Sequence, residues 1–157
     1  MSSPILEVRG LRKYYPVRAG LFGGKRGDVK AVESVSLDVE RGKTLGLVGE
    51  SGCGKSTLGR TIMRLEEPTS GAVRFEGRDV AHASKRELFE LRRDLQMIFQ
   101  DPYASLNPRM SVGSIVSEPI TIHGLARGSA KRDRVHDLLQ TVGLNPYFAS
   151  RYPHEFS

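Results

Sequence analysis

The sequence predicts an α/β fold, and three consecutive observations within residues 44–65 lead to that prediction. An apolar run, residues 44–48, has the composition of a buried strand. A glycine-rich loop, residues 49–54, follows this run without a break. After the loop, Leu58, Ile62 and Leu65 recur at the spacing of one helix face. A strand, a tight loop and a helix in immediate succession form a unit from which α/β folds are built.

The residue types of the loop indicate a nucleotide site. It reads Gly49-Glu50-Ser51-Gly52-Cys53-Gly54-Lys55-Ser56-Thr57, and its glycine, lysine and serine positions have the spacing of a P-loop. Glycines allow a tight wrap that turns successive backbone N–H groups toward a phosphate, and the following helix N-terminus adds partial positive charge. Lys55 is expected to reach the β- and γ-phosphates and Ser56 to bind Mg²⁺. We therefore predict that residues 49–57 bind ATP with Mg²⁺; a ligand-free strand-to-helix turn is the alternative.

A second candidate site follows a short apolar segment, residues 96–99, which we expect to be a strand. Gln100 stands at its end, and a glutamine there could hold Mg²⁺ or the attacking water through its amide oxygen. Gln100 is thus a candidate catalytic and Mg²⁺-binding residue, with an ordinary strand cap as the alternative. Asp101 is disfavoured as a metal-binding acid, because Pro102 holds it extended and no glutamate follows it.

Together these segments resemble the N-terminal part of the ATP-binding subunit of an ABC transporter, in the oligopeptide and dipeptide importer branch. The resemblance extends from Leu6 to Ser157, and three stretches carry it: 44–58, 96–110 and 151–157. The Gly-Cys-Gly-Lys-Ser-Thr form of the loop and the long segment before Ala31 are most similar to the second, F-type ATPase of such importers.

The resemblance implies roles for individual residues and a set of partners. Gln100 matches the glutamine that senses the γ-phosphate, and Tyr15 matches an aromatic residue that stacks on adenine, with Tyr14 as the neighbouring alternative. The implied partners are a second ATPase subunit, in a hetero- or homodimer, two membrane permease subunits and, indirectly, a solute-binding protein. The implied location is the cytoplasmic face of the inner membrane, held peripherally by the permease subunits. The cargo stays open between peptides and related solutes such as nickel or glutathione.

The last residues, Pro153–Ser157, match the approach to the family's signature motif, which continues with Gly-Gly-Gln. We therefore expect a fragment in which the C-terminal part of the fold, including the catalytic glutamate, is missing. Such a fragment would bind ATP without efficient hydrolysis, whereas the full-length protein would be a peptide-transporting ATPase. The alternatives are a non-transport ABC ATPase and a non-catalytic nucleotide-binding remnant.

The expected organisation has three parts: a mostly antiparallel β subdomain (1–43), a P-loop core that ends at Gln100 (44–100) with a β-subdomain strand near 72–77, and a truncated helical subdomain (101–157). Alternation predicts an edge strand over Ile5–Leu11 and its antiparallel partner over Val32–Val39. The glycine-rich stretch Val17–Lys30 is expected to be a long hairpin loop, with Leu21 and Phe22 at a tip that could dock on a partner.

Helix signals occupy the rest of the chain. Ser84 and Glu87 have the spacing of a capping box, which predicts a helix through Leu88, Leu91 and Leu95. Beyond Asp101, apolar residues recur at helical spacing in two groups: Val112, Ile115, Val116 and Ile120, then Val135, Leu138, Leu139 and Val142. Gly143 and Asn145-Pro146 are stop signals for the second helix.

Composition narrows the class of protein. The 157 residues carry a formal net charge of +6, yet the basic residues are scattered without an aromatic-interleaved strip, so we expect no nucleic-acid partner. No run of about 18 apolar residues is present, so no membrane span is expected. Cys53 is the single cysteine of the sequence, which excludes a disulfide framework and fits a reducing compartment.

Overall fold

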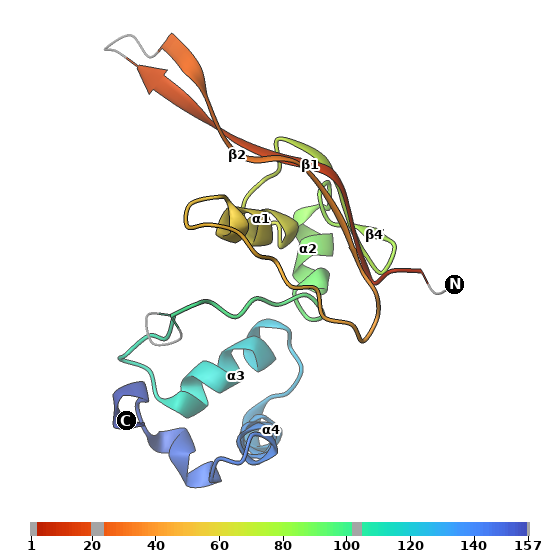
Figure 1. Ribbon diagram of the computed structural model, residues 1–157. Helices are drawn as coiled ribbons and strands as arrows, with labels where there is room; N and C mark the ends of the chain where they lie inside the picture. The colour runs from red at the N-terminus through yellow and green to blue at the C-terminus, as the bar shows by residue number, and fades with distance from the viewer. Residues whose placement is uncertain (1–2, 20–23, 102–104, 157) are drawn as a thin grey trace. The chain divides into compact units, whose positions relative to one another are not determined.

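The computed structural model describes residues 3–19, 24–101 and 105–156, which fall into two compact units, residues 1–97 and 98–157. The first unit contains a four-stranded sheet and two helices (Figure 1): β1 (Leu6–Ala19), β2 (Gly24–Val39), α1 (Lys55–Ile62), β3 (Ser70–Phe75), β4 (Arg78–Asp79) and α2 (Lys85–Leu91). The second unit is helical: α3 (Val112–Ile122), α4 (Gly128–Thr141), and the 3₁₀ turns η1 (Pro146–Ser150) and η2 (Pro153–Glu155). Each unit is described by itself.

The sheet is antiparallel throughout, with the strand order β2-β1-β3-β4. Leu6 pairs with Val39 on one side and with Phe75 on the other, so β1 is a central strand. The prediction of an edge strand over Ile5–Leu11 was therefore wrong, whereas Val32–Val39 is its antiparallel partner as expected. Alternating polarity shows only that one face of a strand is buried, and it does not distinguish an edge strand from a central one.

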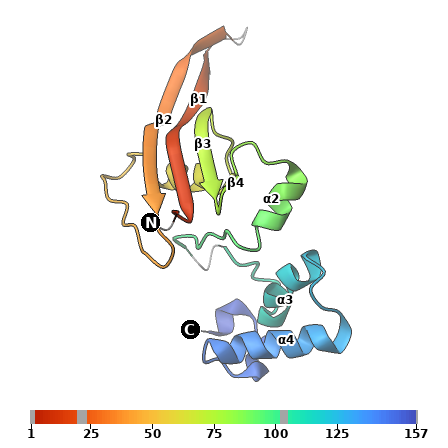
Figure 2. The same ribbon diagram turned by 90° about the vertical axis from the view of Figure 1, so that its right-hand side faces the viewer.

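The hairpin of β1 and β2 is longer than its sequence suggested, and Figure 2 shows it extending beyond β3. The expected loop over Val17–Lys30 is wrong, because pairs such as Tyr15 with Val29 and Val17 with Gly27 continue the ladder. Backbone pairing tolerates polar and glycine residues in a two-stranded ribbon, so composition alone misplaces the loop. The proposed docking tip at Leu21 and Phe22 lies outside the described residues.

Both helices of the first unit lie on the same side of the sheet (Figure 1). The core beneath them joins Val8, Leu11 and Val73 of the sheet, all fully buried, to Leu58 of α1 and Leu91 of α2. The predicted capping box of α2 is present: the Ser84 hydroxyl accepts from the Glu87 amide, and the Glu87 carboxylate accepts from the Ser84 amide.

Two segments expected to be strands, 44–48 and 96–99, have no strand structure. A strand forms only where a neighbouring chain offers backbone hydrogen bonds, and neither segment has such a neighbour among the described residues. Val48 and Ile98 are each 94% exposed, although their apolar character suits a buried strand. These two strand predictions are wrong for the structure at hand, and the observed sheet is antiparallel only.

The helical predictions for the second unit agree with the structure. Ile120 of α3 packs with Val135 and Leu139 of α4 in a small buried cluster. α4 ends before the predicted stop at Gly143, which has a left-handed backbone, and Val142 is exposed rather than packed. Within the described ranges, no helix is both long enough and apolar enough to cross a membrane.

Candidate functional site

The glycine-rich loop leads into α1 through two left-handed residues, Gly52 (φ 83°) and Gly54 (φ 95°). At Gly54 a second constraint applies, because a Cβ atom there would lie 2.1 Å from the backbone oxygen of Ala31 in β2. Only glycine permits both this backbone conformation and this close approach. The sheet therefore seats the loop directly, through a contact that the sequence pattern did not reveal.

The first turn of α1 has free hydrogen-bond donors. Gly54 is its N-cap and supplies no side-chain cap. Across the described part of the chain, the backbone N–H groups of Lys55, Ser56 and Thr57 have no acceptor. Three unpaired donors at the positive end of a helix favour an anion, and a phosphate group has the oxygens to accept from several of them.

The Lys55 side chain folds back onto the loop that precedes α1. Its ammonium group donates to the backbone oxygens of Gly49 and Glu50, each at 2.6 Å, and lies 3.5 Å from the Cys53 sulfur. An ammonium group has three N–H donors, and two of them are used by these carbonyl groups. Lys55 is thus held at the mouth of the loop with a positive charge to offer a phosphate.

Ser56 is exposed in the first turn of α1, where its hydroxyl is free to bind a metal that also contacts a phosphate. Within the ranges that the structure describes, no group of three or more histidine, cysteine, aspartate or glutamate side chains could hold a metal by itself. The residues fit Mg²⁺ that arrives with a nucleotide, because hydroxyl and phosphate oxygens are the ligands this ion prefers.

Tyr15 lies on the side of β1 that faces the end of α1. Its hydroxyl donates to the carboxylate of Glu66, which follows α1 and in turn lies 3.8 Å from Arg60 on that helix. Tyr14 has different partners, since its hydroxyl contacts Glu33 at 3.3 Å and Lys30 lies over its ring. The two neighbouring tyrosines therefore occupy separate environments, and only Tyr15 is linked to the helix that carries the phosphate loop.

Gln100 is exposed and belongs to the second unit, whereas the phosphate loop belongs to the first. Its γ-phosphate and Mg²⁺ roles therefore stay predictions. Sequence analysis missed Ala31, Glu66 and Lys13 as neighbours of the site. The strand alternation of Lys13 and Tyr15 was a usable signal, because residues two apart in a strand share a face.

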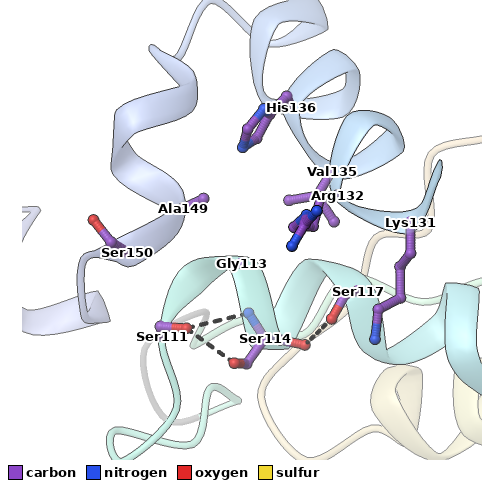
Figure 3. A pocket seen from close by; sticks show the side chains of 10 residues that line it. All are labelled: Ser111, Gly113, Ser114, Ser117, Lys131, Arg132, Val135, His136, Ala149 and Ser150. Carbon is purple, nitrogen blue, oxygen red and sulfur yellow. Dashed lines mark hydrogen bonds between the residues drawn. The ribbon is translucent and has the colours of Figure 1, made fainter. Parts of the chain in front are cut away.

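The second unit has a cavity of about 340 Å³ between α3, α4 and η1, shown in Figure 3. Its floor is apolar, with Val135 and Ala149, and its rim is basic, with Lys131, Arg132 and His136. None of the lining residues is acidic. Ser111 and Ser114 at its edge bond to each other at 2.9 Å, so these hydroxyls mainly cap α3. The cavity therefore suits a partner group that combines negative charge with apolar surface.

Comparison with known proteins identifies the relationships of the chain. The family model described as ABC transporter matches residues 32–157. The oligopeptide transport ATP-binding proteins AppF and OppF of Bacillus subtilis are 53% and 54% identical, over 98% and 100% of this chain. The glutathione import ATP-binding protein GsiA of Salmonella typhimurium is 54% identical over 98% of the chain. The chain spans 47% of AppF, 50% of OppF and 25% of GsiA.

Solved structures show the same relationship. The ATP-binding cassette MJ0796, in a dimeric post-hydrolysis state bound to ADP and Pi, matches with a TM-score of 0.76 and 26% identity, over 97% of this chain and 63% of that chain. The cbiO1 structure from Clostridium perfringens, part of the ABC transporter complex cbiONQ, matches in fold with a TM-score of 0.72 and 24% identity, over 99% of this chain and 57% of that chain.

Proposed function

The chain belongs to the ABC transporter family, and from that premise we propose that it is the nucleotide-binding part of an ATPase subunit that drives import of oligopeptides. The observation that carries the proposal is the phosphate loop, with its unpaired amides at the start of α1 and Lys55 held at its mouth. The relatives named for oligopeptide transport support the class of cargo.

In this proposal the loop residues bind the triphosphate. The backbone N–H groups of Lys55, Ser56 and Thr57 donate to phosphate oxygens, and the Lys55 ammonium group neutralises charge on the β- and γ-phosphates. Ser56 would hold Mg²⁺, and the bound ion would supply positive charge that neutralises the phosphates while the γ-phosphoryl group passes to water. Gly49, Glu50, Ser51, Gly52 and Cys53 form the wall of the loop. Gln100 is proposed to sense the γ-phosphate.

Tyr15 is proposed to stack on the adenine ring. It is 37% exposed, so part of the ring is available to a ligand, and it is connected to α1 through Glu66. Stacking on a phenol ring requires a flat aromatic partner and little hydrogen bonding, so this contact would tolerate other bases. Tyr14 lacks the connection to α1, which favours Tyr15 as the stacking residue.

We also propose the partners and location typical of such a subunit. A second ATPase subunit would complete the nucleotide site, as the dimeric state of MJ0796 suggests by analogy. Two permease subunits would hold the complex peripherally at the cytoplasmic face of the inner membrane, and a solute-binding protein would deliver the cargo. No nucleic-acid partner is proposed.

The basic cavity of the second unit is a candidate contact for a permease segment with an acidic residue. Arg132→Glu should reverse charge at its rim and reduce co-purification of the permease subunits with the ATPase. Arg134→Glu is the matched control, because Arg134 lies on the same helix, is exposed and does not line the cavity. Equal recovery of permease with both variants would exclude the cavity as a contact.

The decisive test of the proposed function is uptake of a labelled oligopeptide by cells that lack the natural protein. Restoring the natural protein should restore uptake, whereas its Lys55→Ala variant should not, because the phosphate loop loses its cation. Equal uptake with Lys55→Ala would reject ATP-driven transport by this site. If the natural protein does not restore peptide uptake, the cargo is not an oligopeptide.

A further inference from the structure

The Tyr15 ring is held from two directions within the first unit. Lys13, two residues earlier on the same face of β1, places its ammonium group 4.8 Å from the ring centre. The same ammonium group donates to the backbone oxygen of Glu67 at 2.9 Å, which fixes its position over the ring. A cation at this distance from an aromatic face attracts the ring electrons. Lys13 therefore covers one face of the Tyr15 ring, while the residue as a whole stays 37% exposed, so part of its surface is available to a ligand.

The hydroxyl end of the ring is fixed by Glu66. One carboxylate oxygen of Glu66 accepts from the Tyr15 hydroxyl, and the other lies 3.8 Å from Arg60. The hydrogen bond to Glu66, followed by burial and the charge of Glu66, raises the pKa of Tyr15 above its ordinary value. The phenol therefore remains a protonated donor at neutral pH. Because Arg60 lies on α1, the ring is tied to the helix that begins at the phosphate loop.

We propose that Glu66 and Lys13 are positioning residues that hold the Tyr15 ring with one face presented to the nucleotide base. The inference rests on the proposed function, because it takes Tyr15 as the base-stacking residue. Both residues act through Tyr15. A ring fixed before binding loses little conformational freedom when the base stacks on it, so these contacts should increase affinity for nucleotides and leave phosphate binding unchanged.

Three variants test the role of Glu66. Glu66→Ala removes the carboxylate, and Glu66→Gln keeps a neutral acceptor for the Tyr15 hydroxyl. Glu67→Ala is the matched control, because its carboxylate is 81% exposed and pairs with Arg64, while Lys13 uses only the backbone of that residue. Binding of Mg-ATP and of inorganic tripolyphosphate, which has phosphates and no base, is measured for the natural full-length protein and each variant.

We expect Glu66→Ala to weaken Mg-ATP binding about three- to tenfold, with tripolyphosphate affinity within about twofold of the unaltered protein. Glu66→Gln should recover part of this loss, and Glu67→Ala should leave the affinity for both ligands unchanged. Lys13→Ala should also lower the affinity for Mg-ATP and leave that for tripolyphosphate unchanged. Lys13→Arg should restore Mg-ATP affinity, because it keeps a cation over the ring.

A spectroscopic reading separates positioning from general stability. The pKa of Tyr15, obtained by ultraviolet titration with the Tyr15→Phe variant subtracted, should fall toward its ordinary value in Glu66→Ala. An unmoved Tyr15 pKa in that variant would overturn the positioning role. Equal weakening of ATP and tripolyphosphate would overturn it too, because it would show a general structural effect.

The remaining outcomes distinguish this inference from its premise. If Tyr15→Ala lowers the affinity for Mg-ATP while Glu66→Ala and Lys13→Ala do not, Tyr15 stacks on the base without the two positioning residues. That result refutes this inference and leaves the proposed function standing. If Lys55→Ala leaves ATP and tripolyphosphate binding unchanged, the proposed phosphate site fails and the inference fails with it.

Discussion

Replacing Gly54 by alanine tests whether the close approach of Gly54 to β2 fixes the position of the phosphate loop. The added Cβ would lie 2.1 Å from the backbone oxygen of Ala31, whereas real Cβ contacts are essentially never under 3.0 Å. The loop must therefore retreat from β2 by at least 0.9 Å, the difference between 3.0 and 2.1 Å. The register of β2 against β1 skips Ala31, but its neighbours Lys30 and Val32 both pair with β1, which limits how far Ala31 can move.

The expected loss combines two effects. A non-glycine residue in the left-handed region costs about 1–2 kcal/mol. Displacing the loop by about 1 Å also moves the amides of Lys55, Ser56 and Thr57, and losing one or two hydrogen bonds to a charged phosphate, at about 1.5–3 kcal/mol each, amounts to about 100-fold in affinity. We therefore predict that Gly54→Ala lowers affinity for Mg-ATP at least about 100-fold.

Gly42→Ala is the matched control. Gly42 is also left-handed, at φ 73°, but a Cβ there would meet nothing within 4 Å. It should lower stability by about 1 kcal/mol and leave nucleotide affinity unchanged. Affinity is read by equilibrium titration with a fluorescent ATP analogue, and circular dichroism confirms that each variant is folded. If Gly54→Ala binds within about threefold of the unaltered protein while folded, the seat at Ala31 does not determine binding.

Three further predictions concern binding and stability. Lys55→Ala should abolish Mg-ATP binding, measured by the same titration; retained binding would contradict its phosphate role. Leu91→Ala should lower unfolding free energy by about 2–5 kcal/mol in urea, because Leu91 is 2% exposed, whereas half-exposed Leu65→Ala should lose less. The Ser84 hydroxyl, then its amide, lowers the pKa of Glu87. This stabilisation exists above the unfolded-state pKa and disappears as pH falls through the folded-state pKa. Ser84→Ala should therefore flatten the dependence of the urea midpoint on acid pH; an unchanged slope would count against it.

Local chemistry could be predicted from the sequence. The phosphate loop, the capping box of α2 and the two helices of the second unit depend on residues close together in the chain, so spacing alone identifies them. Left-handed Gly52 and Gly54 follow from the same pattern, since a tight turn before a helix requires glycine.

Pairing between distant segments could not be predicted in the same way. Residues 44–48 have the composition of a buried strand, but a strand needs a hydrogen-bonded neighbour, and composition cannot say whether one is present. The central place of β1 depends on β3, which lies more than 50 residues later. The contacts of Tyr15 with Glu66 and of Gly54 with Ala31 likewise join segments whose proximity only the fold reveals.

Labelling of Cys53 offers the most direct test of the central claim, that residues 49–57 bind a nucleotide triphosphate. Cys53 is exposed inside this loop and is the single cysteine of these 157 residues, so labelling measured at Cys53 reports on the loop. Mg-ATP should slow labelling in a saturable manner, whereas AMP at the same concentration should not, because it lacks the β- and γ-phosphates. An equal labelling rate with and without saturating Mg-ATP would contradict nucleotide binding at this loop.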